Sequence, residues 1–128
     1  MYIQSLVIYV AATFFLLYGL AFTISPEGMA VLVTQSKPVG TSALIDFRAT
    51  YGGMTVAVGL ALIYLHRINQ TRPGLIIVIL ILMGMAVART AGFLMDGAGN
   101  SIMYVYWGLE IAGSALALYA LQKEPSEN

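Results

Sequence analysis

Four long runs of apolar residues divide the chain, and short polar segments separate them. The runs cover about residues 3–24, 43–65, 74–95 and 101–121. A helix needs about 20 apolar residues to cross the roughly 30 Å hydrocarbon core of a bilayer. Because that core offers the backbone no water, each run is expected to be a helix. The pattern therefore predicts an all-α integral membrane protein, folded as one domain into an antiparallel four-helix bundle.

The polar segments carry signals for helix ends. Residues 25–42 are predicted to be a loop, in which Ser25, Pro26 and Glu27 start a short interfacial helix over residues 29–33. The expected limits of the later spans are starts at Thr41 or Ser42, at Thr71 and Pro73, and at Asn100 or Ser101, with a stop at Asp96-Gly97. Residues 122–128 are predicted to be a polar tail.

Composition supports the same class of protein. Apolar residues make up 59% of the 128 residues and charged residues only 9%, whereas a soluble domain carries about 25% charged residues. Six basic and six acidic side chains cancel, so a nucleic-acid partner is not expected. Without cysteine, and with a single histidine, the sequence predicts no metal site and no catalytic triad.

The basic residues of the loops predict the orientation. His66, Arg67 and Arg72 lie between the second and third runs and Lys123 follows the fourth, whereas Lys37 is the sole base between the first and second. The positive-inside rule then places both termini in the cytoplasm. No base precedes the first run and no small-x-small cleavage site ends it, so we expect it to be a retained span and not a signal peptide.

Three charges lie inside the predicted spans: Arg48, Arg89 and Glu110. A charge at the bilayer centre costs about 2.5–3.5 kcal/mol on insertion scales, so each of them needs compensation. With a rise of ~1.5 Å per residue, they lie roughly 8, 9 and 13 Å from span ends on the same, non-cytoplasmic side. We therefore expect Glu110 to pair with Arg48, with Arg89 or with both, since guanidinium binds carboxylate through two hydrogen bonds.

Other polar and small residues accompany this predicted cluster. Its expected neighbours are Asp46, Tyr51, Tyr106, Trp107 and Asp96. The cluster has two interpretations that the sequence leaves open: a structural ion-pair network or a ligand or ion site. Small residues spaced four apart predict a tight bundle, or a bundle with a self-association face in addition. The residues are Gly52, Gly53, Gly84, Ala88, Gly92 and Gly108.

The second span contains a motif that resembles a known family. Asp46-Phe47-Arg48-Ala49, followed by Tyr51-Gly52-Gly53, resembles the acid-F-R-A-x-Y-G-G signature of a bacterial membrane family, the domain of unknown function 4345. Arg89-Thr90-Ala91-Gly92, Asp96-Gly97 and Glu110 are similar as well, and DoxX-like proteins look like more distant relatives. The resemblance implies a multi-pass protein of the bacterial inner membrane and transfers no catalytic role to any residue.

The sequence leaves several function classes open. The leading expectation is a small inner-membrane protein that is an accessory subunit or binds a lipid or quinone-type ligand at the Arg/Glu cluster. The alternative is a proton, small-ion or solute transporter or channel, working as an oligomer. A small membrane enzyme is the third class, although no catalytic residues are predicted. The expected partners are membrane lipids and a membrane protein or further copies of the chain, and no cofactor is predicted apart from a bound lipid or quinone.

Overall fold

The computed structural model describes residues 2–123, and every regular element in this range is a helix. Three of the four predicted spans are single helices: α1 (Tyr2–Ile24), α5 (Thr71–Met95) and α6 (Ser101–Gln122). The remaining span is compound and joins α3 (Thr41–Phe47), a π-helical segment η1 (Arg48–Met54) and α4 (Thr55–Arg67). All four are long and apolar enough to cross a membrane. Of the predicted polar tail, residues 124–128 lie outside the described residues.

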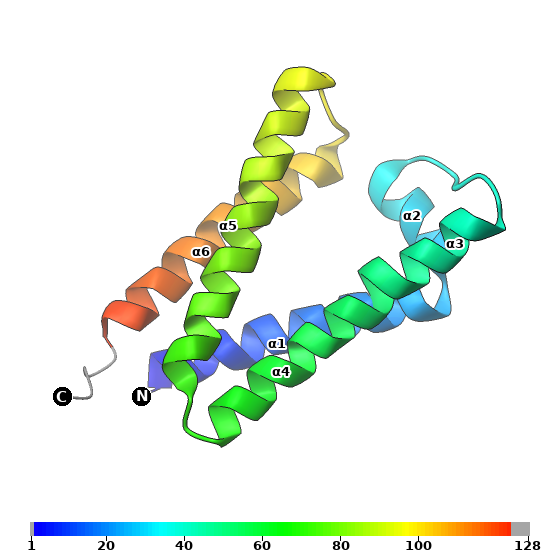
Figure 1. The fold of residues 1–128 in the computed structure, drawn as a ribbon. Helices are drawn as coiled ribbons and strands as arrows, with labels where there is room; N and C mark the ends of the chain where they lie inside the picture. The colour runs from blue at the N-terminus through cyan, green and yellow to red at the C-terminus, as the bar shows by residue number, and fades with distance from the viewer. Residues whose placement is uncertain (1, 124–128) are drawn as a thin grey trace.

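The helices pack as two pairs. Figure 1 shows α1 beside the α3–η1–α4 span and α5 beside α6, with the two helices of each pair running in opposite directions. The pairs meet near the chain termini and diverge toward the opposite end (Figure 1). Completely buried side chains from all four spans form the hydrophobic core at the end where the pairs meet: Ile8, Ala12, Leu62, Leu75, Ala117 and Ala120. The arrangement is therefore more open than the bundle that the sequence predicts.

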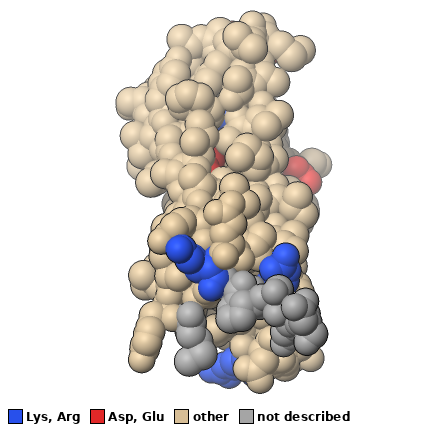
Figure 2. Space-filling model, turned by 90° about the vertical axis from the view of Figure 1, so that its left-hand side faces the viewer, with Lys and Arg blue, Asp and Glu red and all other residues tan. Residues whose placement is uncertain are grey.

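Basic side chains gather at one end of the molecule. Figure 2 shows Lys and Arg gathered at one end, above which lies a broad uncharged surface. Small basic and acidic areas show between uncharged side chains in the middle of this face (Figure 2). Large apolar side chains remain exposed on every span, among them Leu17, Leu60, Leu80 and Leu109. Such a surface fits contact with lipid tails, because monomeric soluble proteins rarely expose apolar patches of this extent.

Glycines bring α1 and the second span into close contact. A Cβ atom added at Gly19 would lie 2.8 Å from the backbone oxygen of Gly52 and 2.8 Å from the backbone nitrogen of Val56. A Cβ at Gly59 would lie 2.9 Å from the backbone oxygen of Ala12. All three distances are shorter than real Cβ contacts, so the two backbones approach this closely only because glycine has no side chain. The π-helical turn η1 lies within this contact, with Gly52 buried against Thr23.

Of the small residues predicted to pack closely, only Gly52 lies in such a close contact between helices. Gly52 packs against α1, but Gly53, Gly84, Ala88 and Gly108 are exposed, and Gly92 is only partly buried. A Cβ added at Gly84 or Gly108 would meet no atom within 4 Å. Close packing within the chain was thus wrongly predicted at these positions, because four-residue spacing identifies one face of a helix without showing which face meets a neighbour. The self-association face stays a prediction. Close packing occurs at Gly19, Gly59 and Gly113, which the pattern did not single out.

A short helix lies at the end of the molecule away from the chain termini (Figure 1). The predicted interfacial helix is α2 (Pro26–Thr34), longer than the expected residues 29–33. After it, Lys37 forms an ion pair with Glu27 at 2.7 Å, and the hydrogen bond to that carboxylate raises the pKa of Lys37. The predicted caps Thr41 and Thr71 are the first helical residues of α3 and α5, where Gly40 and Gln70 hold the cap positions.

Asn100 caps α6, as its place in the sequence predicts. Its side-chain oxygen accepts a hydrogen bond from the backbone nitrogen of Met103 at 3.0 Å. Its side-chain nitrogen donates to the backbone oxygen of Val33 at 3.0 Å and so ties α6 to the end of α2. This one side chain therefore fixes both the start of α6 and the position of the short helix.

Replacing Asn100 with alanine is expected to lower the free energy of unfolding by about 1–2 kcal/mol, the usual cost of losing an N-cap. Asn100→Asp keeps an acceptor for Met103 but loses the donor to Val33, so it separates the two roles. Denaturant titration in detergent micelles measures the free energy of unfolding of both variants. Equal stability of Asn100→Ala and the parent protein would contradict the role assigned to the cap.

Candidate functional site

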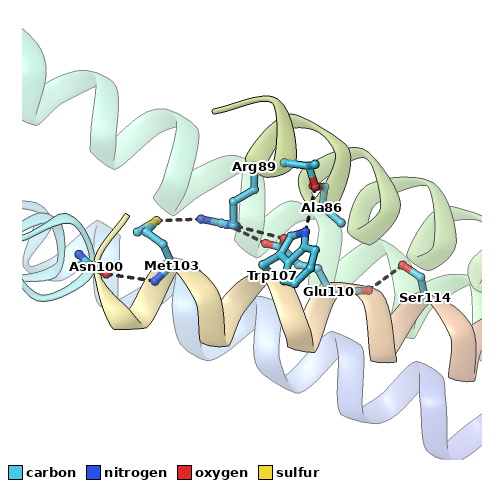
Figure 3. A network of polar contacts seen from close by, with 8 residues as sticks. Ala86, Arg89, Asn100, Met103, Trp107, Glu110 and Ser114 are labelled. Atoms are coloured by element: carbon cyan, nitrogen blue, oxygen red, sulfur yellow. Dashed lines mark hydrogen bonds and ion pairs between the residues drawn. The ribbon is translucent and has the colours of Figure 1, made fainter. Parts of the chain in front are cut away.

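A buried ion pair joins α5 to α6. Arg89 Nε donates to Glu110 Oε2 at 3.1 Å, and Arg89 Nη2 donates to Glu110 Oε1 at 2.7 Å (Figure 3). The side chains are 18% and 5% exposed. Two parallel hydrogen bonds of this kind fix the relative orientation of guanidinium and carboxylate. The pairing neutralises both charges within the apolar span and thereby compensates their transfer from water.

Further contacts fix the register of α5 against α6. Trp107 Nε1 donates to Thr90 Oγ1 at 2.9 Å, and this hydroxyl donates to the backbone oxygen of Ala86 at 2.8 Å. The rings of Phe93 and Tyr104 stack at 4.6 Å between centroids. Both contacts with α6 lie within four residues after Arg89 along α5, at Thr90 and Phe93, and support the orientation of the guanidinium toward Glu110.

The pair leaves part of Arg89 without a strong acceptor. A guanidinium has five N–H donors, and the contacts within residues 2–123 use three of them: two on Glu110 and one on the thioether sulfur of Met103 at 2.9 Å (Figure 3). Thioether sulfur is only a weak acceptor. The guanidinium carbon also lies 5.7 Å from the ring centre of Tyr106. The outer edge of Arg89 is therefore available for a further hydrogen-bond acceptor.

Tyr106 lies beside the guanidinium, and Tyr18 and Tyr51 follow it from two other elements. Tyr18 of α1 interacts electrostatically with Tyr106 of α6, with Tyr51 of η1 and with both members of the ion pair. The rings of Tyr18 and Tyr106 meet edge to face at 6.2 Å, across the two helix pairs. None of the three hydroxyls forms a hydrogen bond with a side chain or backbone group in the described part of the chain. The site therefore combines one neutralised charge pair with several unsatisfied donors.

An aromatic cluster adjoins the tyrosines on the side of α1 and the second span. The ring centres of Tyr18 and Phe22 are 5.0 Å apart, those of Phe22 and Tyr51 5.2 Å, and those of Phe47 and Tyr51 5.2 Å. We refer to Tyr18, Phe22, Phe47 and Tyr51 as the aromatic wall. Phe22 is buried, so the exposed surface of the wall belongs to Tyr18, Phe47 and Tyr51, and Tyr18 reaches Tyr106 of α6.

The structure separates the remaining predicted site residues from this cluster. Arg48 does not pair with Glu110: its Nη1 donates to the backbone oxygens of Thr23 and Ile24, at the last turn of α1. Arg48 thus satisfies carbonyl groups that a helix end leaves without partners. The expected pairing of Glu110 is confirmed for Arg89. The expectation that Arg48 belongs to the same cluster was wrong, because equal depth does not fix the direction in which a side chain points. The sequence also gave no indication of the π-helical turn that starts at Arg48.

The two aspartates lie outside the cluster as well. Asp46 is exposed and accepts a hydrogen bond from Thr50 at 3.4 Å. Asp96 is exposed at the end of α5, beyond its last helical residue Met95. Trp107 reaches Thr90 and not the ion pair. Of the predicted site residues, Arg89, Glu110 and Tyr106 thus lie together, and Tyr51 is connected to them only through Tyr18.

Sequence reasoning missed two members of the site, Tyr18 and Met103. Tyr18 was not among the neighbours expected for the cluster, yet its ring meets that of Tyr106 edge to face at 6.2 Å. The available signal was its position well inside an apolar run, where a phenol usually finds a polar neighbour. Met103 lies almost two helical turns before Glu110 on α6, and only the structure shows its sulfur beside the guanidinium.

The chain was compared with known proteins. The model of the domain of unknown function 4345 (DUF4345) matches residues 3–121, nearly the whole chain. The chain belongs to the DUF4345 family. No curated protein and no solved structure matches this DUF4345 protein, so the resemblance to DoxX-like proteins has no support. The family assignment carries no activity, and the function of the DUF4345 protein must be argued from its site.

Free hydrogen-bond donors characterise this site. Both carboxylate oxygens of Glu110 accept hydrogen bonds from Arg89, so neither oxygen is directed toward a further molecule. Within residues 2–123, no group of three histidine, cysteine or acidic side chains is arranged to hold a metal ion. What the cluster offers is a set of oriented donors at membrane depth, next to aromatic surface.

Proposed function

We propose that this DUF4345 protein binds a hydrophobic molecule of the bilayer at the Arg89–Glu110 cluster and serves as a binding or accessory component of the membrane. The observation that supports this proposal is the excess of donors at the site. Two N–H groups of Arg89 and the hydroxyls of Tyr18, Tyr51 and Tyr106 have no acceptor among the described residues. Unsatisfied donors in a lipid environment are costly, so a ligand that satisfies them gains affinity.

An ion pair with a purely structural role would not need free hydrogen-bond donors around it. Replacing a buried pair by apolar side chains of similar volume is often neutral or stabilising, so pairs of this kind are weak evidence for a stabilising role. Ionisable residues within membrane spans mark functional sites by default. The partial exposure of Arg89, 18% of its side chain, leaves room for one polar atom of a ligand to approach the guanidinium.

We also propose where the protein lies in the cell and how it acts. We place the protein in the bacterial inner membrane with both termini in the cytoplasm, on the basis of Arg67, Arg72 and Lys123. The segments between the spans are short, the longest being residues 25–40 with the helix α2. With so little chain outside the membrane, the protein is better suited to hold a ligand, or to present it to a membrane partner, than to perform chemistry on its own.

The test compares the co-purified molecules of the parent protein and of the double variant Arg89→Met/Glu110→Met. Both proteins are purified in mild detergent, and native mass spectrometry and solvent extraction measure what they retain. We expect about one hydrophobic molecule per chain in the parent protein and none in the double variant, which keeps the volume of the pair and loses its hydrogen bonds. Tyr64→Phe, on the exposed side of α4, is the matched control and should retain the molecule.

Equal retention by the parent protein and the double variant would contradict the proposal, as would a parent protein that retains nothing. In either case the pair would have only the structural role of joining α5 to α6.

A further inference from the structure

The Arg89–Glu110 pair is electrically neutral, which restricts the ligands that the site can take. An anion approaching Arg89 would also approach Glu110, whose oxygens lie 2.7 and 3.1 Å from the guanidinium nitrogens. In a medium of low dielectric constant, the repulsion from the carboxylate offsets much of the attraction to the guanidinium. Arg89 cannot turn to a competing anion without leaving Glu110 buried and unpaired. The pair therefore favours a neutral ligand.

The hydrogen-bonding groups of the site restrict the ligand further. Arg89 can only donate, and the acceptors of Glu110 are turned toward Arg89 in a side chain that is 5% exposed. The free groups around the pair are thus guanidinium N–H donors and the hydroxyls of Tyr18 and Tyr106. The guanidinium requires an acceptor on the ligand, such as a carbonyl oxygen, and the hydroxyls of Tyr18 and Tyr106 can donate to the same atom.

The aromatic wall adds a preference for shape. Its neighbouring rings lie 5.0 to 5.2 Å apart, and Phe22 and Tyr51 are stacked with an angle of 29° between their planes. Aromatic side chains gain from offset stacking on a further flat ring. Tyr18 belongs both to the wall and to the polar cluster, so a ring on the wall would have its substituents close to the donors.

We infer that the ligand is a neutral, carbonyl-bearing amphiphile, with its carbonyl oxygen accepting from Arg89 and the tyrosines and its apolar part in the bilayer. This inference rests on the proposed function and names the chemical class of its ligand. Two bilayer components share that chemistry: a quinone with an apolar side chain and the ester carbonyl of a neutral lipid. The aromatic wall favours the quinone.

The experiment titrates four probes into the parent protein in detergent micelles: a decyl-substituted benzoquinone, dioctanoylglycerol, decyl phosphate and decylbenzene. Trp107 is the only tryptophan of the chain and is hydrogen-bonded to Thr90, the neighbour of Arg89, so its fluorescence gives a local signal. We expect saturable binding of the benzoquinone, weaker binding of the glyceride, and at least roughly tenfold weaker binding of the phosphate and the hydrocarbon, which lack a neutral carbonyl.

The phenylalanine variants connect binding to the tyrosine hydroxyls. Tyr18→Phe and Tyr106→Phe remove hydroxyls that have no protein partner, so the fold loses no hydrogen bond. Each is expected to weaken benzoquinone binding about fivefold, the worth of one hydrogen bond. Tyr64→Phe, far more exposed on α4, is the control and should leave the affinity unchanged.

The outcomes separate the inference from the proposed function. Glyceride binding as tight as quinone binding would support the carbonyl chemistry and identify a lipid as its source. Tightest binding of decyl phosphate, or tyrosine variants with unchanged affinity, would overturn the inference while a retained molecule still supported the proposed function. If no probe binds and the purified protein retains no molecule, both fail.

Discussion

Replacing Arg89 with methionine alone is expected to lower the free energy of unfolding by about 3–5 kcal/mol, the usual cost of breaking a buried ion pair from one side. The change leaves the carboxylate of Glu110 without its two hydrogen bonds in a side chain that is 5% exposed. The remaining contact of that residue, from Ser114 Oγ to its backbone oxygen, does not reach the carboxylate. Denaturant titration in micelles, followed by circular dichroism, measures the loss.

The double variant Arg89→Met/Glu110→Met is the control for this prediction. It removes both charges, so no unpaired group remains, and its stability should lie much closer to that of the parent protein than the stability of Arg89→Met. A double-mutant cycle with Glu110→Met isolates the interaction of the two side chains. Additive effects of the two single substitutions would show that the pair is not coupled in the membrane and would contradict the site described here.

Replacing Gly19 with leucine is expected to cost about 3 kcal/mol, at the upper end of the range for overpacked interiors. The first atom of any side chain at this position meets the backbone of Gly52 and of Val56 at 2.8 Å. Backbone atoms cannot rotate away, so α1 must separate from η1 and α4. Unfolding titrations measure the loss of stability, and cross-linking of cysteines introduced on α1 and α4 measures the separation.

Gly108→Leu is the matched control for this substitution. Gly108 also lies in the middle of a predicted span, but a Cβ there meets no atom within 4 Å. Leucine favours helix more than glycine does and adds apolar surface toward lipid, so we expect unchanged or slightly higher stability. A loss at Gly108 as large as the loss at Gly19 would show that the exposed face of α6 packs against another chain.

The sequence predicted the elements of this protein well because they depend on local properties. Twenty apolar residues in a row need a helix to cross a bilayer, whatever their neighbours are, and the limits of α5 and α6 follow from this requirement and from caps such as Asn100. The second span was less predictable: its π-helical turn at Arg48–Met54 arises where α1 packs closely against Gly52. No pattern within residues 48–54 distinguishes this turn from an ordinary α-helix.

The candidate site was predictable only in part, for a related reason. Charge balance required a partner for Glu110, and depth within the span limited the choice to Arg48 and Arg89. The choice between them depends on the rotation of each helix about its axis, which packing determines. Arg48 turns toward the last carbonyl groups of α1, whereas Arg89 turns toward α6.

The sequence by itself determined that the chain belongs in a membrane, that four segments are long enough to span it, and that Glu110 needs a basic partner. Each of these conclusions follows from the transfer free energies of residues counted along the chain. Only the tertiary structure decided which arginine provides the partner, which glycines touch a neighbour, and that Tyr18 joins the polar cluster. These outcomes depend on which faces of the helices meet, and that is a property of the packed molecule, because helices with apolar residues on all sides have no single face that must be buried.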